Sequence, residues 1–223
     1  MADKLRVVLE TGPKEKKVAV VASDWPGLER GATTRDAAID KLKSYLPRYA
    51  KVAELAGKEK EFAALDGIDV VEQYRGTGST DFWAILFAFS SIDRRRISRT
   101  ELERELGLMQ ACWQFFDGVR ARVSAEMQKG PRGGGRDRDH IVRHTLANEQ
   151  DWARKVGVRT PDGSVVTDTS GLIGYRDDYC AAIREFQSKD RMARTWPLPF
   201  LIRHTAFHTM DHAWEMEDKD LTR

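Results

Sequence analysis

The spacing of the apolar residues changes near Ser98, and this change constrains the fold more than any other feature of the chain. Before residue 76 most apolar residues form short runs that turn residues separate, which is typical of strands. After Ser98 they recur at intervals of three and four residues over long segments, which is typical of amphipathic helices. The sequence therefore predicts an α+β protein, in which a small unit with a sheet is followed by a mainly helical unit.

The N-terminal segment predicts the order strand, strand, helix, strand. Residues 5–10 and 18–22 are expected to form a hairpin, because a polar turn separates the two runs. A helix is expected over residues 34–56, although Pro47 should kink or divide it. Residues 68–74 predict the last strand of this unit.

The next segment has no clear pattern. Residues 76–80, Gly-Thr-Gly-Ser-Thr, have the composition of a phosphate-binding loop, but no Lys follows the last Gly and no clear helix begins there. We interpret them as a linker. The apolar run over residues 82–89 is too short to classify, so a buried strand and a helical turn both stay open. The 223 residues are enough for two modest domains, and we predict a β-β-α-β domain over residues 1–80 and a helical domain over residues 81–223.

Four helices are expected in the C-terminal half of the chain. They are predicted over residues 98–127, 137–156 and 172–187, and from Pro197 or Pro199 to about Asp218. Long helices joined by short or medium loops bury their apolar stripes against one another, so the predicted architecture is a four-helix bundle.

All five histidines fall on two of these helices, His140 and His144 on the second and His204, His208 and His212 on the fourth. Positions four apart differ by roughly 40° around a helix axis, so His208 and His212 point from one face. This spacing is typical of metal ligands. Pairs with the same spacing also occur by chance on exposed helix surfaces, which is the alternative.

The rest of the fourth helix is apolar on most sides, which predicts that most of it is buried. One narrow polar arc holds His204, His208, Asp211, His212 and Glu215. If this arc faces water, the histidines are ordinary surface residues. If it faces the interior, the buried imidazoles need partners, and a metal ion would be one.

On the second helix, His144 lies at the flank of the apolar stripe, whereas His140 lies nearly opposite and should face solvent. His144 is therefore the better third ligand, although a hydrogen-bonded histidine without a metal explains it equally well. Three imidazoles around a divalent ion would leave one position for water, as in catalytic zinc sites. Glu149 lies on the inner stripe and could orient a ligand or act as a base, or it could pair with an arginine.

Residues 141–152 (IVRHTLANEQDW) and 203–218 (RHTAFHTMDHAWEMED) resemble the DinB-like superfamily of four-helix bundles. The usual pattern of that superfamily is one His on the second helix and His-x-x-x-His on the last. The resemblance covers roughly residues 98–223, and it implies that His144, His208 and His212 bind zinc, nickel or a related divalent ion. His140 and His204 have no place in the pattern.

The resemblance also implies the type of function. Relatives in the superfamily include metal-dependent hydrolases and enzymes that act on low-molecular-weight thiols, so we expect hydrolysis or group transfer on a small molecule. Residues 24–34 and their surroundings resemble the small HicB-like fold, which often binds protein partners in toxin–antitoxin systems. The alternative function is therefore a non-catalytic module that recruits a protein through its N-terminal domain, with the metal structural or absent.

Charge argues against a third function, nucleic-acid binding. The chain has 37 basic and 35 acidic residues, a formal charge of +2, which is too balanced for a protein that mainly neutralises phosphates. The arginine clusters at residues 94–96 and at Arg132, Arg136 and Arg138 are interpreted as solvated surface.

The remaining expectations concern surroundings and partners. No apolar run approaches the roughly 20 residues of a membrane span, and the start does not resemble a signal peptide, so a cytoplasmic protein without a membrane partner is expected. Cys112 and Cys180 are too few for a disulfide framework and suit a reducing compartment. A homodimer stays open, because the fourth helix is apolar on nearly all sides.

Overall fold

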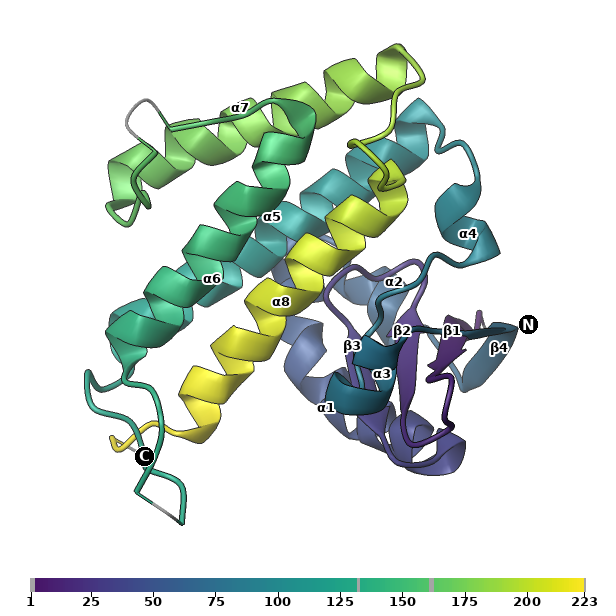
Figure 1. Ribbon diagram of the computed structural model, residues 1–223, viewed down its shortest axis with the longest axis horizontal. Helices are drawn as coiled ribbons and strands as arrows, with labels where there is room; N and C mark the ends of the chain where they lie inside the picture. The colour runs from purple at the N-terminus through teal and green to yellow at the C-terminus, as the bar shows by residue number, and fades with distance from the viewer. Residues whose placement is uncertain (1–2, 132, 161–162, 223) are drawn as a thin grey trace.

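A four-stranded sheet forms the N-terminal part of the protein in the computed structural model, which describes residues 3–131, 133–160 and 163–222 (Figure 1). The strands, in the order β3-β2-β1-β4, are β3 (Glu29–Ala32), β2 (Val18–Ala22), β1 (Leu5–Thr11) and β4 (Ile68–Arg75). β1 pairs with β2 in antiparallel fashion and with β4 in parallel, and β3 is antiparallel to β2. The sheet followed by helices confirms the predicted α+β class.

The strand β3 was not expected from the sequence. It has only four residues, and its first two, Glu29 and Arg30, are charged but buried. Two consecutive charged residues hide the apolar alternation by which a strand is recognised. The predicted order was strand, strand, helix, strand, and the structure adds the strand β3 between β2 and the first helix.

Helix α1 (Arg35–Leu55) packs against β2 and β3 and is followed by the short helix α2 (Glu59–Ala63). The Thr34 hydroxyl accepts a hydrogen bond from the Ala37 N–H at 3.2 Å, which fixes the start of α1. Pro47 does not divide α1, which continues through it as a single helix.

The segment between the sheet and the long helices is ordered by short helices. The expectation that no helix begins in residues 76–80 was wrong, because α3 (Gly78–Trp83) starts there with a capping box between Thr77 and Thr80. Ala84 ends α3 in the left-handed conformation, with φ of 58°. The apolar run over residues 82–89 is thus neither a strand nor a continuous helix, and α4 (Ser91–Arg94) follows it.

Buried carboxylates hold the irregular part of this segment against the sheet. Glu10 accepts hydrogen bonds from the N–H groups of Phe87 and Ala88, and Glu29 accepts one from Leu86 at 2.6 Å. A buried backbone without regular structure needs such partners. Burial raises the pKa of Glu29 to about 8, since it disfavours the charged form.

Four long helices make up the C-terminal part, as predicted: α5 (Arg99–Arg122), α6 (Arg138–Ala153), α7 (Thr169–Ser188) and α8 (Leu198–Asp218). A single 3-10 turn, η1 (Arg154–Val156), extends α6. α8 runs through the middle of the molecule and packs against α5 and α6 (Figure 1). Of its 21 residues, 17 are buried, so it forms the centre of the helical part. Among the described residues, no helix combines the length and the apolar character needed to cross a membrane.

One hydrophobic core joins the sheet to the helices. Leu9 of β1, Tyr49 of α1, Leu106 of α5 and Trp214 of α8 belong to the same cluster of buried side chains. The guanidinium of Arg30 lies between two rings, with its carbon 3.6 Å from the Tyr45 centroid and 4.1 Å from the Trp214 centroid. This cation–π stack gives a buried charge partners on both α1 and α8.

A buried ion pair fixes α8 against α4. The guanidinium of Arg203 on α8 contacts the carboxylate of Asp93, and both side chains are almost fully buried. Arg203 also donates a hydrogen bond to the Ser23 carbonyl at 3.2 Å and lies 3.4 Å from Glu105. Removal of one partner from a buried pair leaves the other charge without compensation, which costs about 3–5 kcal/mol.

We therefore predict that Arg203→Leu lowers the free energy of unfolding by about 3–5 kcal/mol in urea denaturation at pH 7. The matched control is Arg184→Leu, which removes a pair with Glu103 in which both side chains are more than 40% exposed. Exposed pairs contribute about 1 kcal/mol or less. Equal losses in the two variants would contradict the role of Arg203.

Candidate metal centre

Helices α6 and α8 bring three histidines together. His144 comes from α6, and His208 and His212 come from consecutive turns of α8. One nitrogen of each ring lies within 4.8 Å of the other two. The ring centroids are 4.5 Å apart for His208 and His212, and 5.2 Å and 5.0 Å from His144 to these two rings. The structure thus places the three predicted ligands around one point.

The two histidines of α8 have the separation that a shared ion requires. Their Nε2 atoms are 3.2 Å apart. Two nitrogens bound at 2.0–2.1 Å to one tetrahedral zinc ion would be about 3.3 Å apart. A hydrogen bond between the two rings would give a similar distance, so this separation fits a metal without requiring it.

Glu215 orients one of these rings. Its Oε2 atom lies 2.7 Å from Nδ1 of His212, and its carboxylate also pairs with Arg136 at 2.8 Å and Lys219 at 2.6 Å. Burial raises the pKa of Glu215, but hydrogen bonds from His212 and Lys219 outweigh it and leave the pKa below its ordinary value. An ionised carboxylate only accepts hydrogen bonds, so it holds the proton on Nδ1 and leaves the Nε2 lone pair for a metal.

From the sequence, Glu215 was expected on the polar arc of the fourth helix, but no role was predicted for it. The available signal was its position three residues after His212, which puts both side chains on one face of the helix. Carboxylates commonly support metal-binding histidines in this way.

The other two rings are neutral at pH 7. Burial lowers the pKa of His208 well below its ordinary value, and the neighbouring His212 lowers it further. The pKa of His144 is lowered by the same two causes, burial first. Neutral imidazoles are the form that binds metal ions. The Nδ1 atom of His208 is buried and has no hydrogen-bond partner among the described residues.

Two further residues that the sequence singled out lie elsewhere. His140 is exposed in the first turn of α6, as expected. Glu149 is buried and forms a two-pronged pair with Arg176 of α7, with its oxygens 2.9 and 3.0 Å from Nε and Nη2. This is the arginine pair that the sequence left as the alternative. The structure does not bring Glu149 together with the three histidines.

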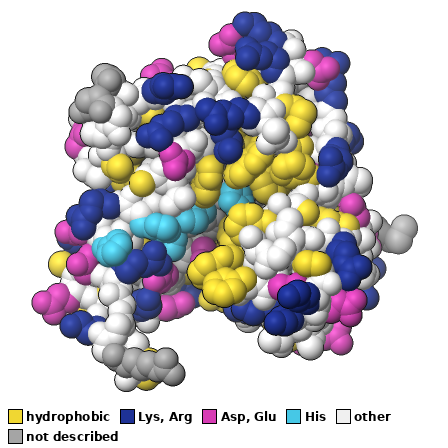
Figure 2. All heavy atoms as spheres, viewed as in Figure 1, with side chains coloured by type: hydrophobic (Ala, Val, Ile, Leu, Met, Phe, Trp, Pro, Cys, Tyr) yellow, Lys and Arg dark blue, Asp and Glu magenta, His cyan; other side chains and the backbone are white. Residues whose placement is uncertain are grey.

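The histidines form part of the wall of a cavity of about 910 Å³. Figure 2 shows the histidine side chains as a line across one face of the molecule, with hydrophobic side chains beside it. Aromatic side chains from four parts of the chain line this cavity: Tyr45 from α1, Trp83 and Phe87 from the segment after β4, Trp152 from α6, and Trp196, Phe207 and Trp214 in and just before α8. Cavities of this size that combine apolar and polar side chains are typical of small-molecule sites.

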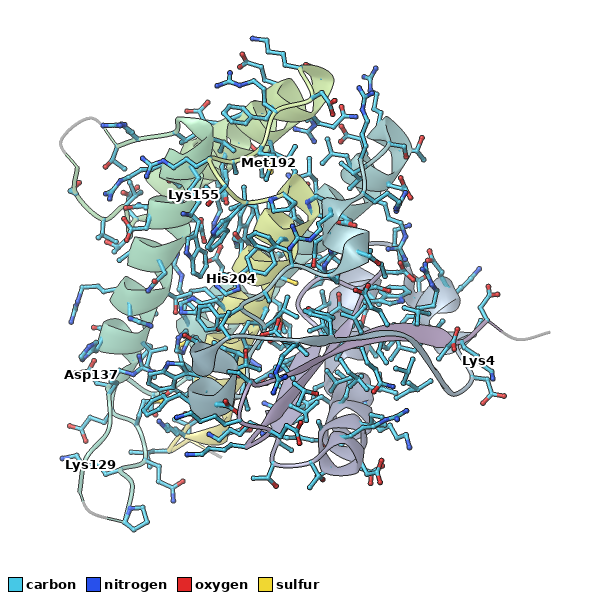
Figure 3. The ribbon with its side chains drawn as sticks, turned by 45° about the vertical axis from the view of Figure 1, so that its right-hand side comes forward. Lys4, Lys129, Asp137, Lys155, Met192 and His204 are labelled. Atoms are coloured by element: carbon cyan, nitrogen blue, oxygen red, sulfur yellow. The ribbon has the colours of Figure 1, made fainter. Side chains whose placement is uncertain are left out.

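His204 lies one turn before His208 and is the most buried of the described histidines, with 5% of its surface exposed. Figure 3 shows its place on α8 in the interior of the molecule. Burial lowers its pKa to about 4, so its ring is neutral. It lies outside the group of three, but it lines the same cavity. Its Nδ1 atom has no hydrogen-bond partner among the described residues, which costs about 1–3 kcal/mol for a buried polar group.

We predict that the protein, purified without a tag and loaded with zinc or nickel, holds close to one ion per chain. His208→Ala should lower the affinity more than 100-fold, because it removes a ligand rather than a supporting group. His140→Ala should leave the affinity unchanged, because that ring faces solvent. Metal analysis after dialysis against a competing chelator measures the affinity of each variant. Equal affinities in His208→Ala and His140→Ala would show that His208 is not a metal ligand.

We predict that Glu215→Gln lowers metal affinity by about 10- to 100-fold, the usual effect of removing a carboxylate that supports a histidine ligand. Glu149→Gln is the matched control, because its side chain contacts Arg176 and not a histidine. An unchanged affinity in Glu215→Gln, or an equal loss in Glu149→Gln, would show that Glu215 does not support the site.

Comparisons with protein-family models, with curated proteins and with solved structures find no match to this chain. The function must therefore be inferred from the geometry of the site.

Proposed function

We propose that this chain is a metal-dependent enzyme that holds a divalent ion, zinc or nickel, on His144, His208 and His212. Its substrate would be a small molecule in the adjoining cavity, and its reaction hydrolysis or group transfer. The observation that carries the proposal is that three imidazole rings converge at the wall of a cavity, and that this cavity is large enough for a substrate.

The donor set fits such an ion. Three imidazoles provide nitrogen ligands, and the carboxylate of Glu215 supports one of them. A divalent ion held by three protein ligands leaves a coordination position open and supplies a Lewis acid. We also propose that the chain belongs to the DinB-like superfamily, because residues 141–152 and 203–218 resemble it.

The side chains of the chain itself would orient the ligands and exclude water. Glu215 keeps the proton on Nδ1 of His212, and Arg136 in turn holds Glu215. Trp152 packs edge-on against His208, with ring centroids 5.0 Å apart, and shields that ring from solvent. An environment with little water strengthens electrostatic interactions with a bound substrate.

One observation favours the alternative function, a module that binds a protein partner. β4 is the last strand on one side of the sheet, and alternate residues along it are exposed, including Val71 at 38%. An open strand edge can pair with a strand of another chain. In that case the histidine site would be structural or would bind no metal.

Activity measurements on metal-loaded protein separate the two functions. We predict that a panel of ester, amide and thiol-transfer substrates reveals an activity that a chelator removes and added zinc or nickel restores. His208→Ala should lose this activity by at least 100-fold, whereas His140→Ala should keep it. If His208→Ala lowers only the melting temperature and no substrate of the panel reacts, the proposal of an enzyme is contradicted and the binding module is favoured.

A further inference from the structure

Four aromatic rings surround the imidazole of His204. The centroid distances from it are 4.7 Å to Trp152, 5.2 Å to Phe200, 5.3 Å to Trp196 and 5.7 Å to Phe87. Trp152, Trp196 and Phe87 also line the cavity, so this end of it is an aromatic wall. Such a wall binds flat aromatic rings by stacking and edge-to-face contact.

His204 is the polar group in this wall. A neutral imidazole carries one hydrogen-bond donor and one acceptor, and its buried Nδ1 has no partner among the described residues. Buried polar groups in native proteins usually have a partner, and those without one call for an explanation. Since Nδ1 is fully enclosed, a polar group at the aromatic end of the cavity would hydrogen-bond to the other ring nitrogen, Nε2.

The charged side chains that line the cavity are already paired. Arg136 pairs with Glu215 at 2.8 Å, Asp211 with Arg30 at 3.2 Å, and Asp218 with Arg48 at 2.9 Å. Among the described residues, each charged side chain that lines the cavity therefore has a partner of opposite charge, so the aromatic rings and His204 determine what binds at this end.

The distance from His204 to the three histidines sets the reach that the compound needs. His204 and His208 are four residues apart on α8, which corresponds to about 6 Å along the helix axis. An aromatic compound of one or two rings, bound at His204, would reach the three histidines with a substituent.

We infer that the substrate is an aromatic molecule with a hydroxyl or carbonyl group, which forms a hydrogen bond with His204 while the rings pack against Trp152 and Trp196. The inference rests on the proposed function for the reaction at the three histidines. The binding of the aromatic molecule can be tested separately.

Equilibrium dialysis of the full chain at pH 7 with three probes tests this inference. The probe 2-naphthol has both features, naphthalene lacks the hydroxyl group, and decahydro-2-naphthol lacks the aromatic rings. We expect one 2-naphthol per chain, bound at least ten times more tightly than either comparison compound. A single hydrogen bond corresponds to a difference of about tenfold in affinity.

The variant His204→Phe keeps a ring but removes the hydrogen bond. It should lower the affinity for 2-naphthol about tenfold and leave that for naphthalene unchanged. His140→Ala, at an exposed position, should leave all three affinities unchanged. If His204→Phe does not fold, the inference is tested by the order of the affinities of the three compounds for the unaltered protein.

Equal binding of the three compounds, no binding of 2-naphthol, or an unchanged preference in His204→Phe would overturn the inference. The metal content of the same samples distinguishes this failure from that of the proposed function. A chain that holds one ion but does not bind 2-naphthol contradicts the inference alone. A chain that binds 2-naphthol as expected but holds no ion contradicts the proposed function alone.

Discussion

The burial of α8 on nearly all sides is the constraint on which the rest of the structure depends. A helix in the middle of a protein must find partners for each of its polar side chains, because an unpaired buried polar group is costly. Arg203 finds Asp93, Glu217 finds Arg48, and His212 finds Glu215. Nδ1 of His204 and Nδ1 of His208 have no partner among the described residues, and both rings lie at the cavity. The buried histidines of α8 thus keep ring nitrogens without a partner in the described part of the chain, beside the Nε2 atoms of His208 and His212 that lie 3.2 Å apart.

The N-terminal sheet contributes to the same site. Glu10 and Glu29 hold the backbone of residues 86–88, and the same segment presents Ile85 and Phe87 to the cavity. Arg30 from β3 pairs with Asp211 on α8. These hydrogen bonds and this ion pair connect the sheet directly to the wall of the cavity.

Local patterns in the sequence predicted the parts of the fold and site that depend on local spacing. The four long helices followed from their apolar period, and the pairing of His208 with His212 followed from their separation by one turn. What the sequence could not provide was the choice among long-range partners. Glu149 had three candidate roles until α7 placed Arg176 beside it. The role of Glu215 can be assigned only once the ring of His212 is known to lie beside it at the cavity. β3 was missed because its charged residues are buried by contacts with distant parts of the chain.

The central claim is that His144, His208 and His212 share one divalent ion. The most direct test is X-ray diffraction at the zinc or nickel absorption edge, on crystals grown with a slight excess of the metal. If the three histidines share one ion, the map should show a single strong anomalous peak between α6 and α8, about 2.0–2.1 Å from one nitrogen of each of the three rings. A map without a peak there, in which His208 and His212 hydrogen-bond to each other or to water, would contradict it.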